Sequence, residues 1–302
     1  MRHRTLGATD LRVSEVGVPV WDLLSRPDDE AAALLRAALD LGVSFFDATD
    51  SDQDGRAERL LGEAVRGHRD EVTVATTFGY DTSRRLFEQA GTGPRHDWSP
   101  SFAGRALDRS LGRLRLEPVD LWQLHHPGMD ALAADELFAF LDEQVAKGKV
   151  RCYGVVLGLG RAGGDEGEVA LRERGVAAVQ AVFNVAEQAP GRELARTAAE
   201  TGAALVARDP LAPRLPADAR ARLDFLARDR GRTLDQALLR FALADPAVAS
   251  VLPPVADAVR LAELAGAADV AELDGEELDR VAELHEARFG AAGPASAQGA
   301  PR

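Results

Sequence analysis

Four aspartates and one histidine are the side chains of this chain most able to carry chemistry. Asp47 ends a short apolar run, Asp50, Asp52 and Asp54 follow it, and His125 ends another apolar run. Carboxylates that are held close together repel one another, so the pKa of one of them should rise. A carboxyl group with a raised pKa beside an imidazole can exchange protons with a substrate. We therefore predict catalytic roles for Asp52, Asp47 and His125.

Eight short apolar runs, each followed by a helical pattern, must position these residues. The runs are residues 15–20, 43–47, 72–76, 119–124, 150–155, 178–182, 203–207 and 248–252. This alternation predicts a parallel sheet, and no Gly-x-Gly-x-x-Gly motif follows the first run to indicate two doubly wound domains. We expect a single α/β domain, a (β/α)8 TIM barrel over residues 1–290 with an N-terminal β-hairpin over residues 3–14. Residues 291–302 are expected to form a disordered tail.

The C-terminal ends of the strands are the place to look for a site, because barrel enzymes carry their reacting groups there. The candidate substrate contacts at that end are Trp21, Tyr80, Trp98, His126, Phe183 and Arg208. A structural role stays open for some of these residues, with Trp21 and Phe183 as core aromatics and His125 as a buried structural histidine. Lys147 and Lys149, the only lysines of the chain, precede a strand and belong at the opposite end.

Three stretches of the chain have a recognisable pattern. They are SFFDATDSDQDGRAERLLGEAV, SLGRLRLEPVDLWQLHHP and KGKVRCYGV. With them, the chain resembles the aldo-keto reductases up to about Gly290, and the first stretch is similar to the family pattern F-D-T-A-x-x-Y-G-x-G-x-S-E. The resemblance implies a (β/α)8 barrel and NADPH-dependent reduction of a carbonyl by an aspartate, a tyrosine, a lysine and a histidine.

Two of those four positions hold a different residue here. The resemblance places the family's aspartate at Asp47 and its histidine at His125. At the family's tyrosine position this chain has Asp52, and at the lysine position it has Thr77. It therefore implies a divergent member without the catalytic tyrosine and lysine. An aspartate ionises far below neutral pH, so it cannot simply replace a phenol as proton donor. Tyr80 is the only tyrosine nearby that offers a substitute.

The cofactor positions implied by the resemblance are also altered. Val156 and Leu157 stand where the family has a serine and an asparagine, and neither side chain can form those hydrogen bonds. Asp257 follows the last strand, where its charge would repel a phosphate. We expect no bound cofactor, with Gln180 and Asn184 as remnants of an NADP site. Phe183 could still serve as a ring that stacks on nicotinamide.

These observations favour a non-redox enzyme that uses acid–base chemistry. The leading hypothesis is a cofactor-independent lyase or isomerase that dehydrates, isomerises or cyclises a small hydroxy-carbonyl compound, in a biosynthetic pathway by analogy. One alternative is an NADPH-dependent carbonyl reductase with an altered site. The other is a non-catalytic binding or scaffold protein that kept only the fold.

Composition limits the partners of the chain. The net charge of −13 argues against a nucleic acid or an anionic membrane, which bind basic surfaces. No apolar run reaches the length of a membrane span, and the first residues lack a signal-peptide core, so we expect a cytoplasmic protein. The single cysteine, Cys152, excludes an intrachain disulfide, and the acidic residues lack a metal-ligand spacing, so no metal is expected. The partner is then a small-molecule substrate, bound by a monomer or a homodimer.

Overall fold

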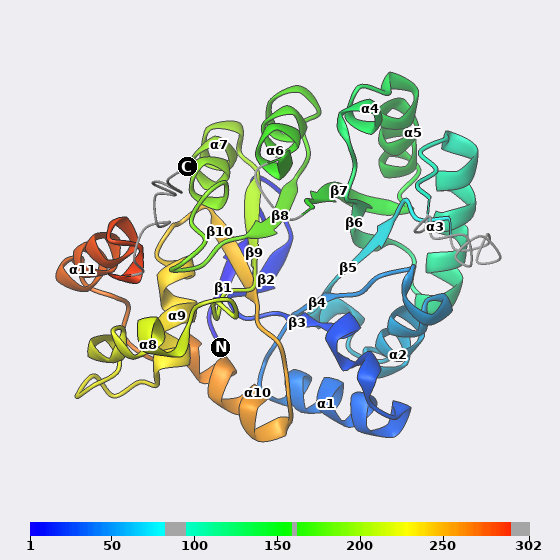
Figure 1. Cartoon of the computed structure of the whole chain (residues 1–302). Helices are drawn as coiled ribbons and strands as arrows, with labels where there is room; N and C mark the ends of the chain where they lie inside the picture. Colours follow the sequence, from blue (N-terminus) through cyan, green and yellow to red (C-terminus); the bar gives the residue numbers. More distant parts are fainter. Residues whose placement is uncertain (82–94, 159–161, 291–302) are drawn as a thin grey trace, which may run out of the picture.

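Eight parallel strands follow one another around a barrel in a computed structural model of the chain, which describes residues 1–81, 95–158 and 162–290 (Figure 1). The strands are β3 (Val18–Pro19), β4 (Phe45–Asp47), β5 (Thr73–Phe78), β6 (Val119–His125), β7 (Val150–Val156), β8 (Ala178–Val182), β9 (Ala204–Arg208) and β10 (Val248–Leu252). A parallel bridge between Val16 and Val251 joins the first strand to the last. The predicted (β/α)8 barrel is confirmed, and the predicted tail lies outside the described residues.

The predicted hairpin is present and covers one end of the barrel. Its strands β1 (His3–Thr5) and β2 (Arg12–Ser14) pair antiparallel. Leu6 and Leu11 of the hairpin are buried in the same cluster as Phe45 and Leu121, which point into the barrel. Because the hairpin closes the N-terminal end, only the C-terminal end is left for a site.

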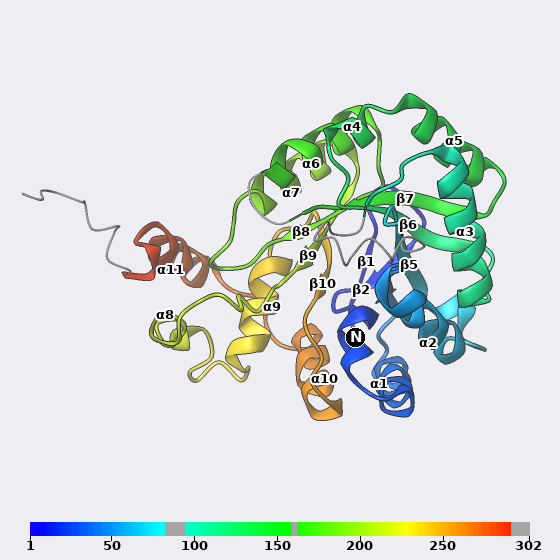
Figure 2. The same cartoon turned by 45° about the vertical axis from the view of Figure 1, so that its right-hand side comes forward.

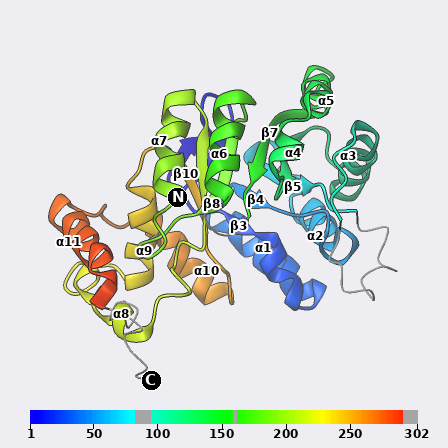
Figure 3. The ribbon, with the colours of Figure 1, turned by 45° about the horizontal axis from the view of Figure 1, so that its top comes forward.

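Helices surround the strands on the outside (Figures 1 and 3). They are α1 (Asp28–Asp40), α2 (Arg56–Ala64), α3 (Pro100–Leu114), α4 (Met129–Leu132), α5 (Asp135–Ala146), α6 (Ala162–Glu173), α7 (Gly191–Thr201), α8 (Ala217–Ala221), α9 (Leu234–Leu243), α10 (Ala258–Ala265) and α11 (Gly275–Glu286). The short α8 and the last helix α11 lie side by side at one edge of the molecule (Figure 2). Within the described ranges, no helix is long and apolar enough to cross a bilayer.

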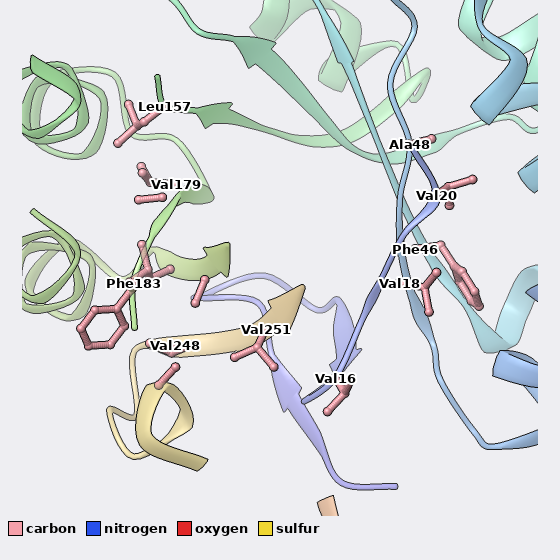
Figure 4. Packing of buried hydrophobic residues seen from close by; sticks show 14 of the residues in the cluster. Val16, Val18, Val20, Phe46, Ala48, Leu157, Val179, Phe183, Val248 and Val251 are labelled. Atoms are coloured by element: carbon pink, nitrogen blue, oxygen red, sulfur yellow. The ribbon is translucent and has the colours of Figure 1, made fainter. Parts of the chain in front are cut away.

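The larger of two hydrophobic cores fills the space between strands and helices. Phe46 and Val18 point outward on one side of the barrel, and Val179 and Phe183 point outward on another (Figure 4). Strand side chains alternate between the two faces, so the inward positions remain for a second, smaller core and for polar groups above it. This alternation decides which residues can reach the site.

Two helices differ from the sequence prediction. The helical pattern of the sequence runs without a break over residues 130–147, but the structure divides it into α4 and α5, because Asp135 and Glu136 favour a new helix start and Arg174 caps the Leu132 carbonyl. The expected helix over residues 217–230 ends at Ala221. By contrast, Thr233 followed by Gln236 three residues later is the sequence pattern of a capping box, and that box is present at the start of α9.

Candidate active site

A buried carboxylate forms the floor of the candidate site. Asp47 ends β4, is only 2% exposed and accepts three hydrogen bonds, from Trp21 Nε1 at 3.2 Å, Gln123 Nε2 at 3.0 Å and Gln180 Nε2 at 3.2 Å. Burial raises the pKa of Asp47 to about 6, although these hydrogen bonds and the charge of Arg208 lower it. The pKa rises as predicted, but burial causes the rise and not repulsion between carboxylates.

Five aromatic side chains gather beside this floor, and we call them the mouth cluster: Tyr80, His96, Trp98, His125 and His126. The Tyr80 hydroxyl lies 3.0 Å from His126 Nδ1, and the Tyr80 ring meets His125 edge-on at 4.9 Å between centroids. His96 packs between Tyr80, at 4.2 Å, and Trp98, at 5.1 Å. A β-bridge between Tyr80 and His96 fixes their backbones, so the cluster is anchored on the end of β5.

The two adjacent histidines of the mouth cluster are neutral at pH 7. Burial, with the charge of Arg208 and the neighbouring imidazoles, lowers the pKa of His125 to about 3 and that of His126 to about 4. Burial also raises the pKa of Tyr80, so its phenol keeps its proton. His126 has the left-handed φ of 55°, held by a hydrogen bond from its N–H to the Val156 carbonyl at 2.8 Å.

The acidic loop does not converge on one point, which corrects the sequence interpretation. Asp50 is 5% exposed and faces away from the mouth, toward Glu58 and Arg113, and burial raises its pKa to about 8. Asp52 begins a 3-10 turn with an exposed side chain, and partial desolvation raises its pKa. Within the described residues, Asp52 forms no hydrogen bond with Asp47 or with His125. The predicted catalytic set is therefore only partly assembled.

A threonine occupies the position beside the histidine where the resemblance implies a lysine. Thr77 Oγ1 lies 3.0 Å from Thr49 Oγ1 and 3.4 Å from His125 Nδ1. The only lysines of the chain, Lys147 and Lys149, lie just before β7 at the opposite end of the barrel, paired with Glu143 and Asp108. The mouth therefore contains no lysine, as the sequence predicted.

Two further predicted residues lie outside the mouth. Phe183 is 3% exposed and packs against Phe241 among the helices, because it continues the outward alternation of Val179 and Ala181 (Figure 4). It therefore cannot contact a substrate at the mouth or stack on a nicotinamide there. Asn184 accepts hydrogen bonds from the N–H groups of Ala186 and Glu187, so it stabilises a turn. Trp98 lies within the mouth cluster.

Sequence reasoning missed one residue of the floor. Gln123 lies in β6, two positions before His125, and its amide bonds Asp47 from inside the barrel. Side chains two apart in a strand share a face, so the placement of His125 at the mouth already indicated an inward Gln123. Within the described residues, no group of three or more His, Cys, Asp or Glu is arranged to hold a metal ion.

Comparison with known proteins places this geometry in a family. The sequence profile of the aldo/keto reductase family matches residues 20–286. The chain belongs to the aldo/keto reductase family. It is similar to the solved aldo-keto reductase AKR11C1 from Bacillus halodurans in its holo form, with a TM-score of 0.82, 26% identity, and coverage of 94% of this chain and 96% of that one.

Two curated relatives match the chain over a shorter length. An uncharacterized oxidoreductase, YqkF of Bacillus subtilis, is 31% identical over 155 residues, which are 51% of this chain and 48% of the relative. A 6-dehydroglucose reductase of Novosphingobium aromaticivorans is 35% identical over 164 residues, 50% of each chain. The chain thus spans about half the length of the curated relatives it matches.

The floor of the mouth suits the nicotinamide end of the cofactor that the family implies. A carboxamide needs a hydrogen-bond acceptor and a donor, and the buried Oε1 of Gln123 has no partner within the described residues, while Gln180 offers an amide. The part of the site that would hold the phosphates of the nucleotide is less accessible. Arg214 is paired with Glu187, and Arg260 with Asp235. A nucleotide phosphate would have to compete with these carboxylates.

Proposed function

We propose that this aldo/keto reductase reduces the carbonyl group of a small molecule, with a nicotinamide nucleotide as hydride source and with Tyr80 and His126 delivering the proton. The observation that carries the proposal is the 3.0 Å contact between the Tyr80 hydroxyl and His126 Nδ1, beside the neutral His125. It supplies a protonated phenol at a mouth where Asp52 stands at the family's tyrosine position. Family membership and the reductase named among the relatives support the same reaction.

The cofactor would be held at its nicotinamide end by Gln180 and Gln123. When bound, a reduced nicotinamide supplies a hydride to the carbonyl carbon. Arg214 and Arg260 would hold the phosphates by exchanging their present carboxylate partners. For Arg214 this exchange is inexpensive, because a partly exposed ion pair contributes about 0–1 kcal/mol.

The protein's own part in the reaction is to bind the carbonyl oxygen and give it a proton. His126 Nε2 is buried without a partner within the described residues, which costs least if that nitrogen is a bare acceptor and Nδ1 carries the proton. His126 Nδ1–H then donates to the Tyr80 oxygen, and the phenol O–H is free to point at the substrate. As negative charge develops on the substrate oxygen, the phenol gives up its proton to it. The neutral imidazole of His125 can hydrogen-bond the same oxygen.

The chain contains its own matched control for this role. The two tyrosines are Tyr80 and Tyr153, and the Tyr153 hydroxyl binds Asp142 outside the barrel at 2.8 Å. With methylglyoxal or pyruvate as carbonyl probe, Tyr80→Phe should lower kcat by about 10²–10⁴-fold, the usual contribution of a general acid. Tyr153→Phe should leave kcat unchanged. Full activity of Tyr80→Phe would show that the proton comes from elsewhere.

The non-redox reaction remains the second candidate because the pKa values of two carboxyl groups on the β4 end and the loop after it are raised. The pKa of the buried Asp47 is raised to about 6, the pKa of the exposed Asp52 is also raised, and the imidazole of His125 is neutral. Such groups can exchange protons with a substrate without any nucleotide. This candidate requires turnover without nucleotide that is lost in Asp52→Asn or His125→Asn. A non-catalytic protein would tolerate both changes.

A further inference from the structure

Arg208, which is half-buried, differs from the two fully buried arginines in lacking a carboxylate partner. Arg240 is 1% exposed and pairs with Glu15, and Arg232 is 8% exposed and pairs with Glu277. Arg208 ends β9 and is half-buried, yet within the described residues no carboxylate lies at ion-pair distance from it. Its Nη2 donates to the Leu157 carbonyl at 2.6 Å, and its buried Nε has no partner there.

Nearby carboxylates do not neutralise this cation. Asp47 is close enough for its charge to act on Arg208, but it already accepts hydrogen bonds from three neutral donors. Asp209 also acts on Arg208 through its charge, and its carboxylate lies 3.7 Å from the exposed Arg214. Burying a guanidinium without an ion partner is costly, and burial accordingly lowers the pKa of Arg208. An anion from outside the chain would relieve this cost.

Arg208 also lies near the groups that would handle the carbonyl. Its charge lowers the pKa of both His125 and His126, so the guanidinium shares the mouth with the two imidazoles. A guanidinium is a planar fork that matches the two oxygens of a carboxylate. A substrate whose carboxylate contacts Arg208 would place its neighbouring carbonyl toward the mouth cluster.

We propose that Arg208 binds the carboxylate of the substrate, so that the preferred substrate is an oxo acid and not a neutral aldehyde or sugar. The reaction on that substrate rests on the proposed reductase function, but the anion site does not. A phosphate of a bound nucleotide would offer similar chemistry to Arg208, and the test separates these two sources of the anion.

The test is a titration of the full chain with oxalate, without nucleotide, by isothermal titration calorimetry. Oxalate carries a carboxylate bonded to a second carbonyl carbon, as a 2-oxo acid does, and oxamide is its neutral analogue. Oxalate should bind, oxamide should not, and Arg208→Gln should weaken oxalate binding by about tenfold or more, the usual effect of losing a charge-assisted hydrogen bond. Arg208→Lys keeps the charge but not the planar fork of the guanidinium, so its oxalate affinity should lie between that of the unchanged chain and that of Arg208→Gln. Arg196→Gln, on the outside of α7, should bind oxalate as the unchanged chain does.

Three results would overturn the proposal. They are no oxalate binding at millimolar concentration, equal binding by Arg208→Gln, and Arg208-dependent binding of pyrophosphate that is tighter than that of oxalate. The last result would assign Arg208 to the nucleotide. If Arg208→Gln does not fold, the comparison of oxalate with oxamide and the Arg208→Lys variant still decide the question. Because no nucleotide is present, failure to bind NADPH leaves this test intact, and failure to bind oxalate leaves the reductase proposal standing for neutral substrates.

Discussion

Burial shifts the pKa values of single side chains, at the mouth and in the loop beside it, more than neighbouring charges do. Asp47, Asp50, His125 and His126 all have pKa values shifted toward the neutral form, and desolvation is the largest cause in each case. Near pH 7 the two histidines are therefore uncharged, while Asp47 at the floor is mostly ionised and Arg208 carries a positive charge. Uncharged groups suit the polarisation of a carbonyl.

The burial of Asp50 can be measured, because it should make the free energy of unfolding depend on pH. The folded chain holds the Asp50 proton up to a pKa of about 8, while the unfolded chain releases it near its ordinary value of 3.8. The folded state thus binds more protons between these values, so the contribution of this group to the free energy of unfolding falls as pH rises from about 4 to about 8. Asp50→Asn, which is neutral at every pH, should therefore stabilise the protein more at pH 9 than at pH 5.

The measurement is urea unfolding at both pH values. Asp54→Asn serves as the control, because this exposed residue of the same loop has a left-handed φ of 59°, which asparagine also tolerates. Its effect should be the same at both pH values. Equal effects of pH on Asp50→Asn and on Asp54→Asn would contradict the burial assigned to Asp50.

At the scale of elements, the end of β5 positions the mouth cluster through one glycine. Gly79 has a φ of 132°, and a Cβ atom there would lie 2.4 Å from the Trp98 ring. Trp98 in turn packs on His96, which packs on Tyr80. A side chain at Gly79 would therefore displace the whole stack.

Gly79→Ala should lower both stability and activity. The left-handed backbone and the clash together should cost about 1–3 kcal/mol, the range for strained φ/ψ and overpacking. The control is Gly112→Ala in α3, where an added Cβ meets nothing within 4 Å and alanine should stabilise the helix by about 0.5–1 kcal/mol. Thermal unfolding and kcat with methylglyoxal report the two effects. A Gly79→Ala variant as stable and active as the unchanged chain would show that the stack does not position Tyr80.

Elements were predictable from sequence where their signals are local. The caps at Ser99 and Thr233 depend on neighbouring residues, and both are present. The break between α4 and α5 depends on Arg174, which is distant in the chain, so periodicity alone could not predict it. Strand alternation would have been required to predict that Gln123 points inward. Predicting that Asp50 points outward would have required knowledge of how α2 and α3 pack.

At the scale of the whole molecule, the residues that stabilise the barrel and the residues of the candidate site lie in different parts of it. The hairpin closes the N-terminal end, the larger core lies between strands and helices, and polar residues collect at the C-terminal end. Strand alternation and the family resemblance predicted this architecture, and the profile match to residues 20–286 confirms the family. The reaction could not be predicted in the same way, because it depends on whether the phosphate end of the site accepts a nucleotide.

Nucleotide binding is the measurement that tests the central proposal most directly. The purified chain would be titrated with NADPH and with NADP, following tryptophan and nucleotide fluorescence, with Trp21 bonded to Asp47 at the floor as a reporter. We expect saturable binding in the micromolar range, as is usual for enzyme ligands. Absence of binding up to millimolar nucleotide would contradict the reductase function and leave proton-transfer chemistry at Asp47, Asp52 and His125.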